Sequence, residues 1–167
     1  MATDKAFPTR IDIRPETRTA MVALLNRQLA AITDLFTQTK FSHWNVKGPQ
    51  FIALHKLFDE LAEKVEDAVD DVAERATALG GVALGTARMT VAASPLKEFP
   101  AGVFAGSKVV AALAEQYAAV GKGVRDAITQ ATAADDAGTA DLFTGIVRML
   151  DQALYFLEAH GEAAAGQ

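Results

Sequence analysis

The residues most able to do chemistry lie in the stretch FSHWNVKGPQFIALH, residues 41–55, and in the acidic run that follows it. The stretch holds two of the chain's three histidines, His43 and His55, and its single tryptophan, Trp44. Imidazole nitrogen and carboxylate oxygen together form the mixed ligand set that suits Fe(II), Mn(II) or Zn(II). The sequence contains no cysteine, so any metal must be bound by nitrogen and oxygen. The pattern therefore predicts a metal site.

Helical geometry separates the carboxylates of the acidic run. The run consists of Asp59, Glu60, Glu63, Glu66, Asp67, Asp70, Asp71 and Glu74. A solvated helix face is the ordinary interpretation for most of these residues. At about 100° per residue, however, His55 shares the flank beside the apolar stripe with Asp59, Glu66, Asp70 and Glu74. We therefore expect part of this flank to bind metal.

Spacing along the helix divides the candidate ligands into two half-sites. His55 and Asp59 are one turn apart, as are Asp70 and Glu74, so each pair can meet one ion. His55 and Asp70 lie about 22 Å apart along the axis, so one chain cannot close the site. If two copies of this helix cross antiparallel about a two-fold axis near residues 64 and 65, His55 faces Glu74 and Asp59 faces Asp70. Each dimer would then carry two identical sites.

His43 lies just before the Gly48-Pro49 turn and can fold back beside His55. A histidine near a helix end is more often a capping or packing residue, and Trp44 alone is more often a core or interface residue. The acids at complementary spacing favour the metal site over these alternatives. No Glu-x-x-His motif is present, which argues against a di-iron centre inside a single bundle.

Four long segments carry apolar residues at the spacing of an α-helix. They cover residues 15–45, about 49–79, a stretch after Ser107 and another from about Thr139. The connector between the second and third is about 26 residues long, and Ser94-Pro95 is expected to cap a short helix within it. This pattern predicts an all-α, ferritin-like four-helix bundle with a long crossover that contains a short helix between helices two and three.

Length and composition predict one domain, formed by residues 15–160, with tails at residues 1–14 and 161–167. The net charge of −5 argues mildly against a nucleic-acid binder whose whole surface is basic. No stretch approaches the roughly 18 apolar residues of a membrane span, and no apolar secretory signal is visible. We therefore expect a cytoplasmic protein.

The sequence resembles the Dps family, the DNA-binding proteins from starved cells, which are mini-ferritins. The resemblance rests on HWNVKGPQFIALHKLFDE, DDVAERATALGGVALGT and TADLFTGIVRMLDQALYFLE, and it covers about residues 15 to 160. It implies four-helix subunits assembled as a hollow homododecamer, with ferroxidase sites at two-fold dimer interfaces. The implied metal ligands are three residues of one subunit and two of its neighbour: His43, His55 and Asp59, then Asp70 and Glu74.

The resemblance also implies a reaction. Fe(II) would be oxidised, preferably by hydrogen peroxide and otherwise by O2, and Fe(III) would be stored as a mineral in the cavity, which protects DNA from oxidative damage. Residue types do not distinguish iron from zinc or manganese as the ion resident in a purified sample. Trp44 would lie beside the site and take up stray oxidising equivalents.

Three further acids, Asp135, Asp136 and Asp141, lie where the family lines its three-fold pores. An acidic ring there would concentrate Fe(II) by focusing negative potential. The alternative is a loop and a helix N-terminus, where acids are favoured for a local reason.

The termini bear on DNA binding, which family members often achieve through a lysine-rich tail. Residues 1–18 carry four basic side chains against three acidic ones, a net charge of +1, and only Lys5 is a lysine. The C-terminal EAHGEAAAGQ has no lysine or arginine. We therefore expect DNA binding to be weak and strongly salt-dependent, or absent. A nucleoid-compacting DNA-binding protein with secondary metal sites is the alternative function.

Overall fold

A computed structural model describes residues 6–162 of the chain. Within this range the chain forms helices and no β-sheet. The helices are α1 (Pro15–Asn45), α2 (Phe51–Ala78), α3 (Ala87–Ala93), α4 (Gly106–Ala133) and α5 (Ala137–Glu162). No helix in this range has the length and apolar character needed to cross a membrane. Lys5 and the end of the predicted C-terminal tail lie outside the described residues.

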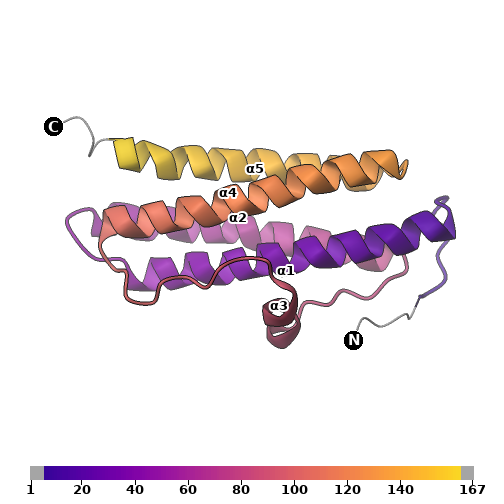
Figure 1. Cartoon of the computed structure of the whole chain (residues 1–167), viewed down its shortest axis with the longest axis horizontal. Coiled ribbons are helices and arrows are strands. Elements are labelled where there is room, and N and C mark those ends of the chain that lie inside the picture. Colours follow the sequence, from indigo (N-terminus) through magenta and orange to yellow (C-terminus); the bar gives the residue numbers. More distant parts are fainter. Residues whose placement is uncertain (1–5, 163–167) are drawn as a thin grey trace.

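The four long helices form one bundle, and α3 lies beside α1 on the outside of it (Figure 1). α1 packs along α2 and α4 packs along α5, while α1 also contacts α4 and α2 also contacts α5. The start of α4 lies beside the turn before α2, because the Lys47 N–H donates to the Phe104 carbonyl at 2.8 Å and the Gly106 N–H donates to the Lys47 carbonyl at 3.1 Å. Residues 79–105 therefore return along the bundle, which confirms the predicted all-α bundle with its long crossover.

The core is formed by the apolar stripes that the sequence predicts. Phe58, Tyr117 and Phe143 are among its largest fully buried side chains. Burial of such a side chain contributes about 1.5–3 kcal/mol, so the stripe facing inward holds each helix in place. The buried positions of α2 are Leu54, Phe58, Leu61, Ala62, Val65, Ala68, Val72 and Ala76. The acidic run lies on the rest of the surface of α2, where Asp59 is half-buried and its other carboxylates are exposed.

The short helix of the crossover begins and ends differently from the prediction. Its N-cap is Thr86, whose hydroxyl accepts a hydrogen bond from the Met89 N–H at 3.4 Å. Ser94 is the C-cap, with extended backbone angles of φ −63° and ψ 132°. Pro95 disfavours a helical conformation in the residue before it, so Ser94-Pro95 ends this helix and does not begin it. The Ser94 hydroxyl donates to Asp34 Oδ2 at 2.5 Å and joins the crossover to α1.

The boundaries of the long helices are close to those expected. α1 has the predicted ends, and α2 begins at Phe51 because Gly48, with φ 120°, forms part of the preceding turn. α5 begins two residues before Thr139 and continues to Glu162. Within the predicted N-terminal tail, Ile11 and Ile13 pack against the core. That part of the segment therefore lies on the bundle.

Gly80 directly follows Leu79, the C-cap residue of α2, and has a left-handed conformation with φ 88°. Its N–H donates to the Thr77 carbonyl at 2.9 Å, and the Gly81 N–H donates to the Ala76 carbonyl at 3.0 Å. This is the Schellman pattern of hydrogen bonds. An added Cβ would meet the carbonyl oxygen of Phe7, so both the backbone angle and the available space require glycine.

We predict that Gly80→Ala lowers the free energy of unfolding by about 1–3 kcal/mol, because alanine is strained at positive φ. Urea unfolding followed by circular dichroism at matched protein concentration measures the change. Gly145→Ala is the control, since nothing lies within 4 Å of its added Cβ. In mid-helix this control should stabilise by about 0.5–1 kcal/mol. Changes of the same sign in both variants would contradict the assigned role of Gly80.

Candidate metal centre

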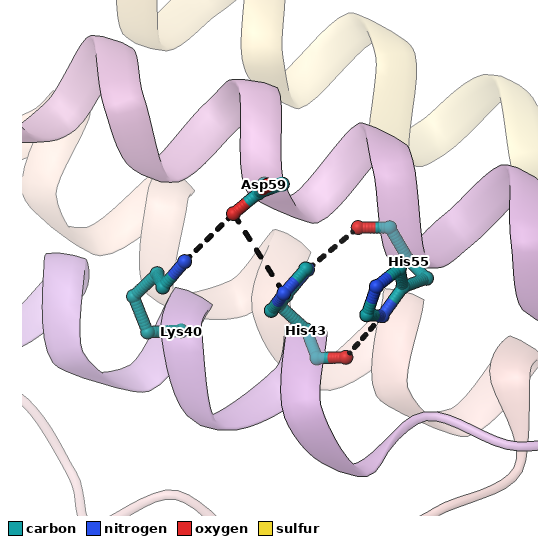
Figure 2. A network of polar contacts seen from close by, with 4 residues as sticks. All are labelled: Lys40, His43, His55 and Asp59. Carbon is teal, nitrogen blue, oxygen red and sulfur yellow. Dashed lines mark hydrogen bonds and ion pairs between the residues drawn. The ribbon is translucent and has the colours of Figure 1, made fainter.

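The turn between α1 and α2 places His43 opposite His55. His43 lies in the last turn of α1 and His55 in the second turn of α2. Their rings stack with centroids 3.8 Å apart and planes inclined by 22°. Figure 2 shows the two rings between the helices, with Asp59 and Lys40 on one side of them. The structure therefore confirms the prediction that His43 folds back beside His55.

Each histidine is oriented by the backbone of the other. His43 Nδ1 lies 2.8 Å from the His55 carbonyl oxygen, and His55 Nδ1 lies 2.9 Å from the His43 carbonyl oxygen (Figure 2). A carbonyl oxygen only accepts, so both Nδ1 atoms must donate their protons. In the neutral imidazole this leaves the lone pair on Nε2, the atom that binds a metal. Carbonyl partners of this kind hold histidine ligands in the correct tautomer and orientation.

Asp59 contributes an oxygen donor next to His43. Its Oδ1 lies 3.7 Å from His43 Nε2. Two metal–ligand bonds of about 2.1 Å span at most about 4.2 Å, so one divalent ion can bridge these atoms. Lys40 donates a hydrogen bond to the same oxygen at 2.7 Å, and this bond lowers the pKa of Asp59 below its ordinary value. Imidazole nitrogen and ionised carboxylate oxygen are donor types that divalent transition metals take.

A single chain brings together only three of the five predicted ligands. Asp70 and Glu74 are exposed further along α2, whose rise of about 1.5 Å per residue separates them from His55 by roughly 22–29 Å. Among residues 6–162, no three His, Asp or Glu side chains are grouped so that they could hold a metal ion. The fold brings His43, His55 and Asp59 side by side. Their role as metal ligands and the contribution of Asp70 and Glu74 from a second copy both stay predictions.

Trp44, next to His43, is 63% exposed. The interpretation of Trp44 as a core residue is therefore wrong for the single chain. Ile52, on the other side of the turn, is 60% exposed. Large apolar side chains this open suit an interface with a second copy, and the role of Trp44 beside a metal site remains a prediction.

The three predicted pore acids have different environments. Asp135 and Asp141 are exposed, whereas Asp136 is only 2% exposed. Asp136 Oδ1 accepts hydrogen bonds from the Thr139 N–H at 3.0 Å and from Arg75 at 2.8 Å, and Oδ2 accepts from the Thr139 hydroxyl at 2.6 Å. Asp136 therefore caps the N-terminus of α5, and its expected place on a pore wall is corrected. The pore role of Asp135 and Asp141 stays a prediction.

Lys40 is the site residue that sequence reasoning missed. It lies one turn before His43 on α1, and Asp59 lies one turn after His55 on α2. In an antiparallel helix pair, the residues one turn beyond a contacting pair form the next contacting pair. Once His43 and His55 were paired across the turn, the same rule would have placed Lys40 beside Asp59.

Comparison with known proteins agrees with this fold. The chain matches the family model for the ferritin-like domain over residues 22–164. It is 39% identical to a DNA protection during starvation protein of Agrobacterium fabrum, over 93% of this chain and 96% of that protein. The structure matches DpsA14 from Streptomyces coelicolor with a TM-score of 0.88 and 37% identity, covering 93% of this chain and 92% of that one.

A third match is Dps from Mycobacterium smegmatis, with a TM-score of 0.90 and 29% identity over 96% of this chain and 98% of that one. Family model, sequence relatives and solved structures agree over nearly the whole chain. The chain belongs to the ferritin-like proteins and, within them, to the Dps family.

The hydrogen bonds that Asp136 accepts from Thr139 and Arg75 predict how stability depends on pH. Burial alone would raise the pKa of Asp136, but the hydrogen bonds from Thr139 and Arg75 outweigh it and lower this pKa below its ordinary value. A depressed folded-state pKa stabilises the fold above the unfolded-state pKa, and this contribution is lost as pH falls through the folded value. We predict that Asp136→Asn lowers the free energy of unfolding at pH 7 by about 1–3 kcal/mol.

Urea unfolding of both proteins between pH 7 and pH 3 measures this difference, which should be constant above about pH 5 and shrink below about pH 4. Asp126→Asn is the control, because the exposed Lys122–Asp126 pair contributes little to stability. A difference that grows towards low pH would contradict the assigned charge state of Asp136.

Proposed function

We propose that the protein is a ferroxidase that oxidises Fe(II) with hydrogen peroxide or O2 and stores Fe(III) inside a hollow homododecamer. Two copies share each site, one supplying two imidazoles and one carboxylate and the other supplying two carboxylates. The observation that carries this proposal is the reciprocal hydrogen bonding of His43 and His55, which directs both Nδ1 protons to carbonyl oxygens and leaves both Nε2 atoms for metal. The proposed ligands are His43, His55 and Asp59 of one subunit, with Asp70 and Glu74 of its neighbour.

The ligand types suit iron oxidation. Carboxylates are hard donors that stabilise Fe(III) over Fe(II), so a site that brings Asp70 and Glu74 to the imidazole side favours loss of an electron. Two Fe(II) ions each lose one electron, and one hydrogen peroxide takes up both electrons and two protons to form two water molecules. Because both electrons arrive together, no hydroxyl radical is released. Zinc or manganese can occupy the same donors without this reaction.

The arrangement of α2 supports sharing between copies. α2 is unbroken from Phe51 to Ala78, and Asp70 and Glu74 are exposed on it. An antiparallel partner helix would bring these acids to His55 and Asp59 at both ends of one interface. Trp44 would then lie at this interface beside the site, and Asp135 and Asp141 would attract Fe(II) at the pores.

We predict that His43→Ala and Asp70→Ala each slow Fe(II) oxidation by at least about tenfold while the shell remains assembled. In a mixed dimer one site carries both substitutions and the other carries neither. Random reassociation of equal amounts should therefore restore about a quarter of the sites. Stopped-flow absorbance of Fe(III)-oxo formation after anaerobic Fe(II) loading and peroxide addition measures the rate.

Each variant dissociated and reassociated alone is the control, and size-exclusion chromatography checks that the shell has formed. Mixed shells as slow as the two parents would contradict ligands shared between subunits. Glu74→Ala should behave as Asp70→Ala does, and it should complement His43→Ala but not Asp70→Ala. This second pattern separates shared sites from a general recovery on mixing.

DNA binding is proposed to be weak or absent. The Phe7 N–H donates to the Gly80 carbonyl at 2.7 Å, so the described part of the N-terminal segment is held on the bundle. A gel shift in low salt should disappear at physiological salt. A shift that persists there, and is lost on deletion of residues 2–10, would support the alternative of a nucleoid-compacting protein.

A further inference from the structure

The turn between the two histidines is held by a segment from far along the chain. Lys47 lies in this turn, where its N–H donates to the Phe104 carbonyl at 2.8 Å and its carbonyl accepts from the Gly106 N–H at 3.1 Å. The two bonds form a parallel bridge between Lys47 and Ala105. Residues 47–50 are exposed, so burial of their side chains does not fix the path of the turn. The start of α4 therefore holds the turn through the backbone.

Gly106 also lies directly against α2. A Cβ added to Gly106 would lie 2.7 Å from Leu54 Cδ1, much closer than the contact distance of two carbon atoms. Leu54 is fully buried in the core, so its methyl group has little room to move aside. Leu54 directly precedes His55 on α2. A residue without a side chain at position 106 thus lets α4 begin against the turn of α2 that carries His55.

Lys47 reaches His55 through its side chain as well. The Lys47 ammonium lies 5.7 Å from the centre of the Phe51 ring, and the Phe51 ring lies 5.1 Å from the His55 ring. We infer that the start of α4 positions His55 for metal binding, directly through the contact of Gly106 with Leu54 and indirectly through Lys47 and Phe51. Gly106 is a positioning residue in this arrangement, because it acts only through its neighbours. The inference rests on the proposed function.

Calorimetric titration of the assembled, metal-free protein with Zn(II) tests this role, because Zn(II) binds imidazole and carboxylate without being oxidised. We expect Gly106→Ala to weaken Zn(II) binding by about tenfold, because the added methyl group displaces Leu54 and with it the His55 ring. Leu54→Val removes the Cδ1 atom that the methyl group meets. The double variant Gly106→Ala/Leu54→Val should therefore recover most of the lost affinity.

Val124→Ala is the matched control for a general loss of stability. Val124 is fully buried on the same helix, about 27 Å from Gly106 along its axis. Its truncation destabilises the core far from the turn, so this variant should bind Zn(II) as the unaltered protein does. Size-exclusion chromatography and circular dichroism check that each variant is folded and assembled.

Phe51→Leu keeps the test decisive if Gly106→Ala does not assemble. It removes the ring between Lys47 and His55 without altering the start of α4, and it should also weaken Zn(II) binding. Unchanged affinity in this variant would overturn the inference.

Unchanged Zn(II) affinity in an assembled Gly106→Ala would likewise overturn the inference, because the methyl group would then be accommodated without movement of His55. Equal weakening by Val124→Ala would overturn it too, since affinity would then follow overall stability. So would a double variant that recovers nothing, because the loss would not come from the contact with Leu54. Zn(II) binding that His43→Ala leaves unchanged would instead overturn the proposed function, whatever Gly106→Ala does.

Discussion

The two hydrogen bonds between the side chains of His43 and His55 and each other's backbone are the contact on which the site depends. They join the last turn of α1 to the second turn of α2, so the orientation of both rings is tied to the register of the two helices. Gly48, with φ 120°, lets the chain reverse in the few residues available. A shift of one residue in either helix would break both bonds at once, because each histidine is donor through its ring and acceptor through its carbonyl.

α1 also binds the crossover between α2 and α4 through its polar side chains. Asn26 donates to the Val82 carbonyl at 2.9 Å and accepts from the Leu84 N–H at 2.8 Å, and Asp34 accepts from Ser94. Asn26 thus gives two half-buried backbone groups of the crossover their hydrogen-bond partners, and Asp34 holds the Ser94 side chain. The helix that carries His43 therefore also fixes the path of the crossover.

Periodicity and spacing predicted the helices, the core stripes and the approach of His43 to His55, because these follow from interactions local in sequence or across one short turn. The exposure of the Trp44 side chain and the N-cap residue of α3 were harder to predict. From sequence alone, Ser94-Pro95 can either begin or end a helix. The structure decides between the two, because the Thr86 hydroxyl caps the N-terminus of α3 and leaves Ser94 at its C-terminus. Nothing in the composition of the loop shows which of two nearby hydroxyls takes the N-cap.

Two further features depend on contacts between residues far apart in the chain. The family resemblance placed Asp136 on a pore wall. In the structure, Arg75 of α2 forms an ion pair with the Asp136 carboxylate inside the subunit. Lys40 was missed because a lone lysine on an amphipathic helix has no distinctive pattern. Its ion pair with Asp59 becomes evident only in the fold, where the turn between α1 and α2 places the two side chains opposite each other.

The length of α2 is the last constraint, and it links the subunit to the assembly. In the proposed antiparallel pair, each step forward along one copy of α2 faces a step back along the other. His55 of one copy therefore meets Glu74 of the other, and Asp59 meets Asp70, in one register only. Inserting one residue between these two positions would rotate the acids by about 100° and shift them by about 1.5 Å relative to the imidazoles. In that proposal, the unbroken helix from Phe51 to Ala78 sets the distance between two groups of ligands that lie too far apart to meet within one chain.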